Sequence, residues 1–129
     1  MIEAYSKIKN GSVKLSKNFK VSEFACKDGS DVIFIDSELV DVLQKIRDHF
    51  GKPLIINSGF RTASYNKKIG GATYSQHLYG KAADIRITGV APKEVAKFAE
   101  TLLVGKGGIG IYTNFTHIDV RKIKSRWNG

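Results

Sequence analysis

The sequence predicts an α+β fold: a small, mostly antiparallel sheet with helices packed on one side. Amphipathic helical patterns alternate with short apolar segments of strand length, and the last two such segments are separated only by a turn at residues 113–114. The chain of 129 residues fits a single domain, 1–129, in which the polar and basic residues 1–15 are expected to be loosely held.

The first half of the chain is predicted to contain one long helix, two short helical segments and a strand. Residues 36–50 give the clearest helical pattern, and Asp36 can cap its start. A short helical segment within residues 16–24 precedes it. A buried strand at residues 54–57 and a short helix at residues 62–69 follow. The apolar residues of the long helix recur at spacings of three and four, which places them on one face: Leu39, Leu43, Ile46 and Phe50.

The second half adds three strands and one helix. Residues 82–87 form a strand that carries Asp84 on one face. Pro92 suits the first position of a helix that runs to about residue 103. Residues 109–112 and 116–120 then form a hairpin, and a basic tail closes the chain.

The cysteine count and the length of the apolar runs limit the classes of protein to which this chain can belong. Cys26 is the only cysteine, so the chain has no internal disulfide and no thiolate zinc site. Folding without disulfides fits a reducing cytosol. The first residues lack the basic and apolar regions of a secretory signal, and no apolar run is long enough for a bilayer. We therefore expect a protein made in the cytoplasm, with no membrane span.

The chain is strongly basic, with 21 lysines and arginines, 12 acidic residues and a formal net charge of +9. Such a surface attracts polyanions. It fits a solvated face, an anionic substrate matrix such as a bacterial wall, or nucleic acid. No nucleic-acid-binding motif and no row of stacking aromatic residues accompanies the basic residues, so nucleic acid is not the expected partner.

Three residues of metal-ligand type stand out: His77, Asp84 and His117. Two imidazoles and one carboxylate can hold a zinc ion and leave one position open, which is characteristic of a catalytic zinc. Asp84 follows two alanines that permit close packing, and His117 lies in the hairpin that can pair beside the Asp84 strand. A lone histidine at either position would more often be an ordinary hydrogen-bonded residue, so the interpretation depends on all three converging.

These residues belong to a longer pattern that resembles the zinc D-alanyl-D-alanine carboxypeptidase family, which includes phage L-alanyl-D-glutamate endolysins. The resemblance covers about residues 16–127 and implies a hedgehog-like zinc peptidase fold. It also implies one zinc ion, held by His77, Asp84 and His117, that activates water to hydrolyse peptidoglycan stem-peptide or cross-link bonds. The matching segments are Ser58-Gly59-Phe60-Arg61, Asn66, Gly70-Gly71-Ala72, Ser75-x-His77-x-x-Gly80-x-Ala82-x-Asp84 and His117-x-Asp119.

The resemblance implies further roles around the ion. Arg61 corresponds to the arginine of the family's Ser-Gly-Tyr-Arg motif, with Phe60 in place of tyrosine. It would stabilise a developing oxyanion or orient a substrate carboxylate; a surface salt bridge is the alternative. Ser75 would bind substrate or support the ligand loop, or simply cap its turn. Tyr112 could donate a hydrogen bond to the oxyanion.

The family pattern leaves the general base unassigned. Many members carry Glu or Asp three residues before the second histidine, where this chain has Asn114, which cannot take a proton at neutral pH. Asp119 is the natural substitute, because residues two apart on a strand face the same side and Asp119 therefore points where His117 points. Alternatively, Asp119 orients a ligand or pairs with Arg61 or Arg121.

The expected function is that of a monomeric zinc peptidase acting on bacterial peptidoglycan peptides. It would be of the D-alanyl-D-alanine carboxypeptidase or endopeptidase type, or of the L-alanyl-D-glutamate endolysin type. A basic domain without a signal or a wall-binding repeat fits a phage or prophage lysis enzyme that acts on the wall after release. The alternative is a binding module that keeps the zinc without the chemistry, as the hedgehog signalling domain does, and Asn114 favours it.

Overall fold

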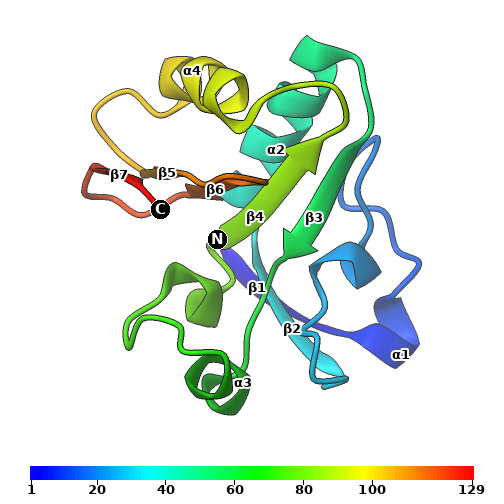
Figure 1. Cartoon of the computed structure of the whole chain (residues 1–129). Helices are drawn as coiled ribbons and strands as arrows, with labels where there is room; N and C mark the ends of the chain where they lie inside the picture. Colours follow the sequence, from blue (N-terminus) through cyan, green and yellow to red (C-terminus); the bar gives the residue numbers. More distant parts are fainter.

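A five-stranded sheet forms the centre of the computed structural model, which describes all 129 residues (Figure 1). Its strands are β3 (Leu54–Ser58), β4 (Ala82–Ile87), β5 (Gly108–Ile111), β6 (Thr116–Asp119) and β7 (Ser125–Asn128). They lie in the order β3-β4-β6-β5-β7. All neighbours are antiparallel except β5 and β7, which are parallel. The predicted α+β fold with a mostly antiparallel sheet is confirmed, and the parallel pair makes the sheet mixed.

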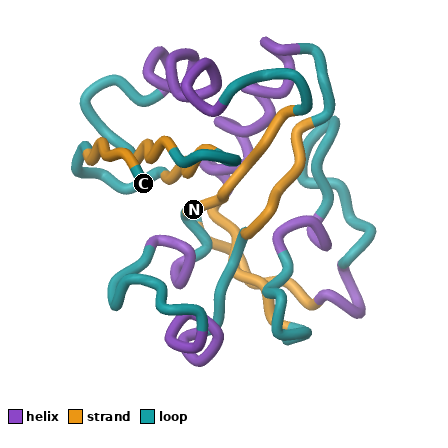
Figure 2. Tube along the Cα trace, viewed as in Figure 1, coloured by secondary structure: helices purple, strands orange, loops and turns teal.

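The two long helices, α2 (Ser37–Phe50) and α4 (Pro92–Leu102), lie together on one side of β5 and β6. The short helix α3 (Ala63–Lys68) and the 3-10 helix η2 (Gln76–Tyr79) lie on the other side (Figures 1 and 2). No helix has both the length and the apolar character that crossing a bilayer requires. The apolar faces of the long helices are buried against the sheet: Leu39, Leu43 and Ile46 in α2, Val95 and Ala99 in α4.

Local capping explains why the helices begin and end near the predicted positions. The Asp36 carboxylate accepts a hydrogen bond from the backbone N–H of Glu38 at 2.9 Å, which caps α2. Gly51 ends α2 in the left-handed conformation, with φ of 62°. Thr62 caps α3 through the N–H of Tyr65. The helical segment predicted within residues 16–24 is the short 3-10 helix η1 (Val21–Phe24).

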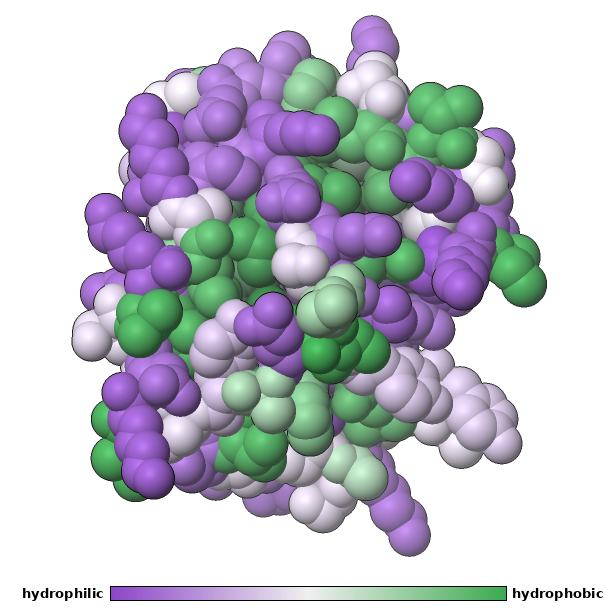
Figure 3. Space-filling model, turned by 180° about the vertical axis from the view of Figure 1, so that it is seen from behind, coloured by the Kyte–Doolittle hydropathy of each residue, from purple (hydrophilic) through white to green (hydrophobic).

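The first residues differ from the expectation of a loosely held end. Strand β1 (Ile2–Ser6) pairs with β2 (Val32–Asp36) in a separate two-stranded antiparallel sheet, and helix α1 (Lys7–Asn10) follows directly. Ile33 and Ile35 of β2 face the core and are buried. The pairing joins segments about thirty residues apart, so no local periodicity in the polar first segment announces it. Viewed from behind, hydrophilic residues spread over the surface with hydrophobic ones between them (Figure 3).

Candidate metal centre

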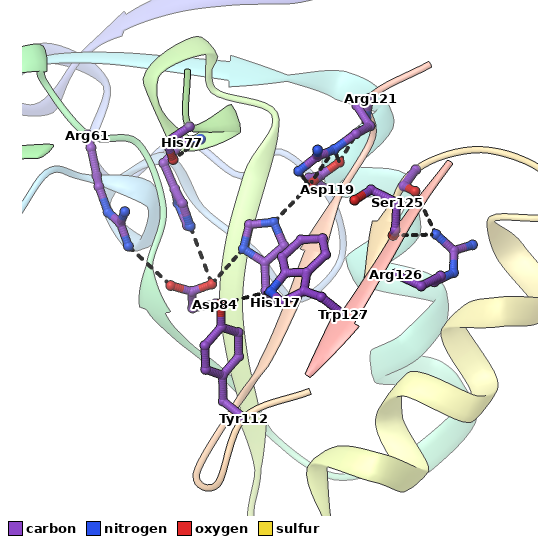
Figure 4. Close-up of polar contacts among 12 residues, drawn as sticks. Arg61, His77, Asp84, Tyr112, His117, Asp119, Arg121, Ser125, Arg126 and Trp127 are labelled. Atoms are coloured by element: carbon purple, nitrogen blue, oxygen red, sulfur yellow. Dashed lines mark hydrogen bonds and ion pairs between the residues drawn. The ribbon is translucent and has the colours of Figure 1, made fainter. Parts of the chain in front are cut away.

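The three residues predicted as metal ligands come together in the structure (Figure 4). Asp84 lies in β4 directly opposite His117 of β6, and His77 approaches from η2. One possible ligand atom from each residue lies within 4.8 Å of the others, and all three residues are buried. Strand register therefore positions two of the candidate ligands, and a short loop helix brings in the third.

The ring of His77 is oriented by a backbone carbonyl. Its Nδ1 lies 2.7 Å from the carbonyl oxygen of Gly59, which can only accept, so Nδ1 carries the proton and Nε2 keeps its lone pair. Nε2 is buried without a hydrogen-bond partner and lies 3.3 Å from Oδ1 of Asp84. A buried lone pair facing a carboxylate oxygen is unfavourable unless a cation lies between them, so this arrangement fits a metal ion.

The loop that carries His77 is fixed at both ends. Oγ of Ser75 accepts a hydrogen bond from the backbone N–H of His77, so Ser75 supports the ligand loop and caps η2. Gly80 ends η2 with φ of 71°, and any side chain there would clash with the carbonyl of Phe34. The N–H of Arg61 also donates to the carbonyl of His77. The glycine in the sequence motif is thus required by both backbone conformation and space.

Asp84 is the centre of the cluster. Its Oδ1 lies 2.9 Å from Nδ1 of His117, and its Oδ2 accepts from Nη2 of Arg61 at 3.2 Å. Burial alone would raise the pKa of Asp84, but the hydrogen bond with His117 and the contacts with His77 outweigh it and hold the pKa well below its usual range. Asp84 is therefore an ionised carboxylate at neutral pH, as a metal ligand must be.

Arg61 orients Asp84 and is itself held on three sides. Its Nε donates to Oγ of Ser58, and its Nη1 donates to Oδ1 of Asn66. Asn66 is anchored in turn by the carbonyl of Ala72. The Arg61 side chain is 13% exposed and its ion pair with Asp84 is largely shielded, so it is not the surface salt bridge considered as an alternative. Sequence reasoning included Asn66 in the motif without giving it this role.

His117 lies between two carboxylates. Its Nε2 lies 2.8 Å from Oδ2 of Asp119, on the opposite side of the ring from Asp84. Arg121 donates to both oxygens of Asp119, at 2.9 Å to Oδ1 and 2.6 Å to Oδ2. Burial raises the pKa of Asp119, but His117 and Arg121 lower it below its usual range. Burial lowers the pKa of His117, but the two carboxylates raise it overall.

The structure places Asp119 behind its neighbouring ligand. Asp119 is fully buried, and both of its oxygens are engaged by His117 and Arg121. This is the geometry of a residue that orients a metal-bound histidine, one of the two roles the sequence left open. Asn114 is exposed in the turn before β6 and lines a small cavity with Pro92 and Thr116, on the α4 side. That position faces away from the cluster.

Two glycines in β5 make room for the cluster. Gly108 lies opposite Asp119, and Gly110 lies opposite His117 and beside Trp127 of β7. A methyl group on Gly108 would clash with the Asp119 carboxylate, and one on Gly110 would clash with the Trp127 ring. Glycines in a strand often mark such close approaches, so the spacing of Gly108 and Gly110 is a signal of this site in the sequence.

Trp127 is the site residue that sequence reasoning missed. The sequence places it in a basic tail, whereas β7 brings its ring centroid to 5.0 Å from that of His117. The Arg121 guanidinium lies 5.4 Å from the Trp127 centroid. Its Nε1 donates to the Tyr112 hydroxyl at 2.9 Å. That hydroxyl points toward Asp84 in Figure 4 and keeps its own proton available as a donor.

Comparison with known proteins places the chain in a family. The sequence pattern of the family described as Peptidase M15 matches residues 17–119, which is most of the chain. The chain belongs to the peptidase M15 family. A probable peptidoglycan L,D-endopeptidase MepK from Haemophilus influenzae is 31% identical over 137 residues, covering 93% of this chain and 72% of that protein.

Two further relatives match shorter stretches. The peptidoglycan L,D-endopeptidase MepK of Escherichia coli is 36% identical over 94 residues, 66% of this chain and 50% of that protein. The zinc D-Ala-D-Ala carboxypeptidase of Streptomyces albus G is 48% identical over 44 residues, 33% of this chain and 17% of that protein. The chain thus spans half or less of these two relatives. The suspected family is confirmed.

Proposed function

We propose that this protein is a zinc-dependent peptidase that hydrolyses peptide bonds of bacterial peptidoglycan. One observation carries the proposal: the free nitrogen of His77 and Nδ1 of His117 face the same Asp84 oxygen in a buried site. The names of the relatives supply the metal and the substrate class. A bound zinc ion would polarise the scissile carbonyl and acidify a water molecule.

The roles of the chain's own residues follow from their contacts. His77, Asp84 and His117 would hold one zinc ion. Arg61 binds the outer oxygen of Asp84 and fixes the plane of that carboxylate. Asp119 accepts the Nε2–H of neutral His117 and so leaves Nδ1 free for the metal.

One substrate contact is assigned to Tyr112, whose hydroxyl points toward Asp84 in Figure 4. The Tyr112 hydroxyl, fixed by Trp127, would donate a hydrogen bond to the oxyanion that develops during hydrolysis. Ser75 keeps the role of supporting the ligand loop, because its Oγ is engaged with the N–H of His77. The substrate bond is proposed to lie in a stem peptide or cross-link, and the enzyme is proposed to act as a monomer on the wall, in the manner of an endolysin.

Release of new amino groups from purified peptidoglycan by the zinc-loaded protein tests this function. Release that disappears with chelator and in His77→Ala would support it. Mass spectrometry of the fragments would then name the bond, whether D-Ala-D-Ala, L-Ala-D-Glu or an L,D cross-link. Absence of release from several wall types would contradict the proposal.

A second candidate is a zinc-holding binding module without turnover. The observation that favours it is that no free carboxylate is seen where a general base is expected. Asp119 has both oxygens engaged, and Asn114 faces the other side of the sheet. This candidate predicts stoichiometric zinc, binding of wall fragments and no amino-group release in the same experiment.

A further inference from the structure

A groove of about 600 Å³ is lined in part by residues that neighbour the candidate metal centre. None of the three candidate ligands lines it, but two of its lining residues are near neighbours of them. Gln76 precedes His77 in η2, and Arg121 is bonded to Asp119, which in turn contacts His117. The remaining wall comes from the loop between β6 and β7, and Figure 4 shows Ser125 beside Arg121. The groove therefore lies one residue from His77 and two side-chain contacts from His117.

All of the charged side chains that line the groove are cationic: Lys81, Arg121, Lys122 and Lys124. Lys81 and Arg121 have carboxylate partners, but both partners are buried and do not line the groove: Asp36 is 2% exposed and Asp119 0%. An anion that enters therefore meets positive charge without an exposed carboxylate. A cleft lined by one sign of charge concentrates its field on a ligand of the opposite sign.

The lining cations differ in how firmly they are held. Nζ of Lys81 lies 2.7 Å from Asp36, and Arg121 is bonded to Asp119 and lies over the Trp127 ring. These two charges have fixed positions at the inner wall. Lys122 and Lys124 are exposed and make no ion pair, so both ammonium groups are free to bind a ligand. The groove thus combines a fixed inner wall with two uncommitted cations at its rim.

We propose that this groove is a binding subsite for a carboxylate of the peptide substrate, next to the bond that is cut. The inference rests on the proposed function, because wall peptides supply the carboxylates. A peptide seated on the metal would place a flanking acidic group within reach of Lys122 and Lys124, whereas a neutral flanking group would leave both lysines solvated.

The test compares two synthetic stem pentapeptides that differ only in whether their carboxylates are free or amidated. Wild-type protein, Lys122→Gln/Lys124→Gln and the matched control Lys14→Gln/Lys17→Gln are each loaded with zinc. The control removes the same charge from the segment between α1 and η1, on the opposite side of the molecule from β7 (Figure 1). KM and kcat are measured for each peptide.

We expect wild type and control to favour the free carboxylates through a KM lower by about three- to tenfold, the range for one or two solvent-exposed ion pairs. The groove variant should lose that preference with kcat unchanged, and salt should weaken it in wild type. Equal KM values for the two peptides in wild type, or a preference that survives in the groove variant, would overturn the subsite.

Failure of the proposed function would look different from failure of the subsite. If the zinc-loaded wild type cuts neither peptide, calorimetric titration of the same two peptides still measures binding. A carboxylate preference that is lost in Lys122→Gln/Lys124→Gln would then support the subsite on a protein without turnover. Equal dissociation constants for the two peptides would overturn it there as well.

Discussion

The two histidines of the candidate metal centre are oriented by different chemistry. His77 lies in a 3-10 helix and donates to the Gly59 carbonyl at 2.7 Å, whereas His117 lies in a strand and contacts the Asp119 carboxylate at 2.8 Å. A backbone carbonyl is neutral and no side-chain substitution removes it. A carboxylate held by Arg121 responds to both mutation and pH. The orientation of His117 can therefore be changed by altering a charge, whereas the orientation of His77 depends on the position of its loop.

Removing either histidine should have the largest effect on zinc binding and on hydrolysis. His77→Ala and His117→Ala each leave two ligands, so we expect bound zinc to fall from one equivalent to near zero and hydrolysis to fall to background. Metal analysis after gel filtration and the amino-group assay measure both. Retention of a full equivalent of zinc by either variant would contradict the three-ligand site.

Substitutions of Asp119 separate an orienting role from a catalytic one. Asp119→Ala leaves the Nε2–H of His117 without its partner, and we expect zinc affinity to fall about 10- to 100-fold. Asp119→Asn keeps an oxygen that can accept that hydrogen bond, so most of the affinity and part of the activity should remain. Competition with a chromogenic chelator gives the affinities.

The same two variants also test the opposite assignment. If Asp119 were the general base, Asp119→Asn would bind zinc normally and have no turnover. Asp41→Asn, an exposed carboxylate on α2, is the matched control and should behave as wild type in both measurements.

The stability of the metal-free protein in acid tests the electrostatic contact between Asp119 and His117. The pKa of Asp119 is lowered in the folded state, so its stabilisation is present above the ordinary value of 3.8 and is lost as pH falls through the lowered pKa. The pKa of His117 is raised from 6.5, so its contribution is complete below that pH and constant in acid. Asp119→Asn should therefore flatten the fall in unfolding free energy that begins at about pH 5 and continues below about pH 3.

Urea unfolding in chelator at several pH values measures this effect. At neutral pH we expect Asp119→Asn to cost about 1–3 kcal/mol, because a buried charge-assisted network loses one member. If the unfolding free energy of Asp119→Asn fell with pH in parallel with that of wild type, His117 and Arg121 would not be stabilising the ionised form of Asp119.

The smallest predicted effect concerns the donor that fixes Tyr112. Trp127→Phe keeps a ring against His117 but removes the Nε1–H that bonds the Tyr112 hydroxyl. One neutral hydrogen bond contributes about 1 kcal/mol, so kcat should fall by about fivefold with zinc affinity unchanged. Tyr112→Phe should lower kcat at least as much, and the double variant should add little. Additive losses would argue against a shared role.

Local patterns explain why much of the fold could be predicted. The spacing of apolar residues in α2, the Asp36 cap and Pro92 at the start of α4 act within one or two helical turns, and each is visible in a short window. The strand at Ala82–Ile87 has the bounds that its composition indicated. Strands β1 and β7 could not be predicted, because their hydrogen bonds go to β2 and β5, far away in the sequence.

By itself, the sequence determined the set of candidate ligands and the local elements that carry them, because residue type and short-range periodicity do not depend on distant partners. The spacing of two in β6 put Asp119 on the same side as His117. Only the tertiary structure decided which ring nitrogen Asp119 meets and that Arg121 occupies both of its oxygens. It also brought Gly59 to His77 and Trp127 to Tyr112, because such contacts depend on how separate segments pack.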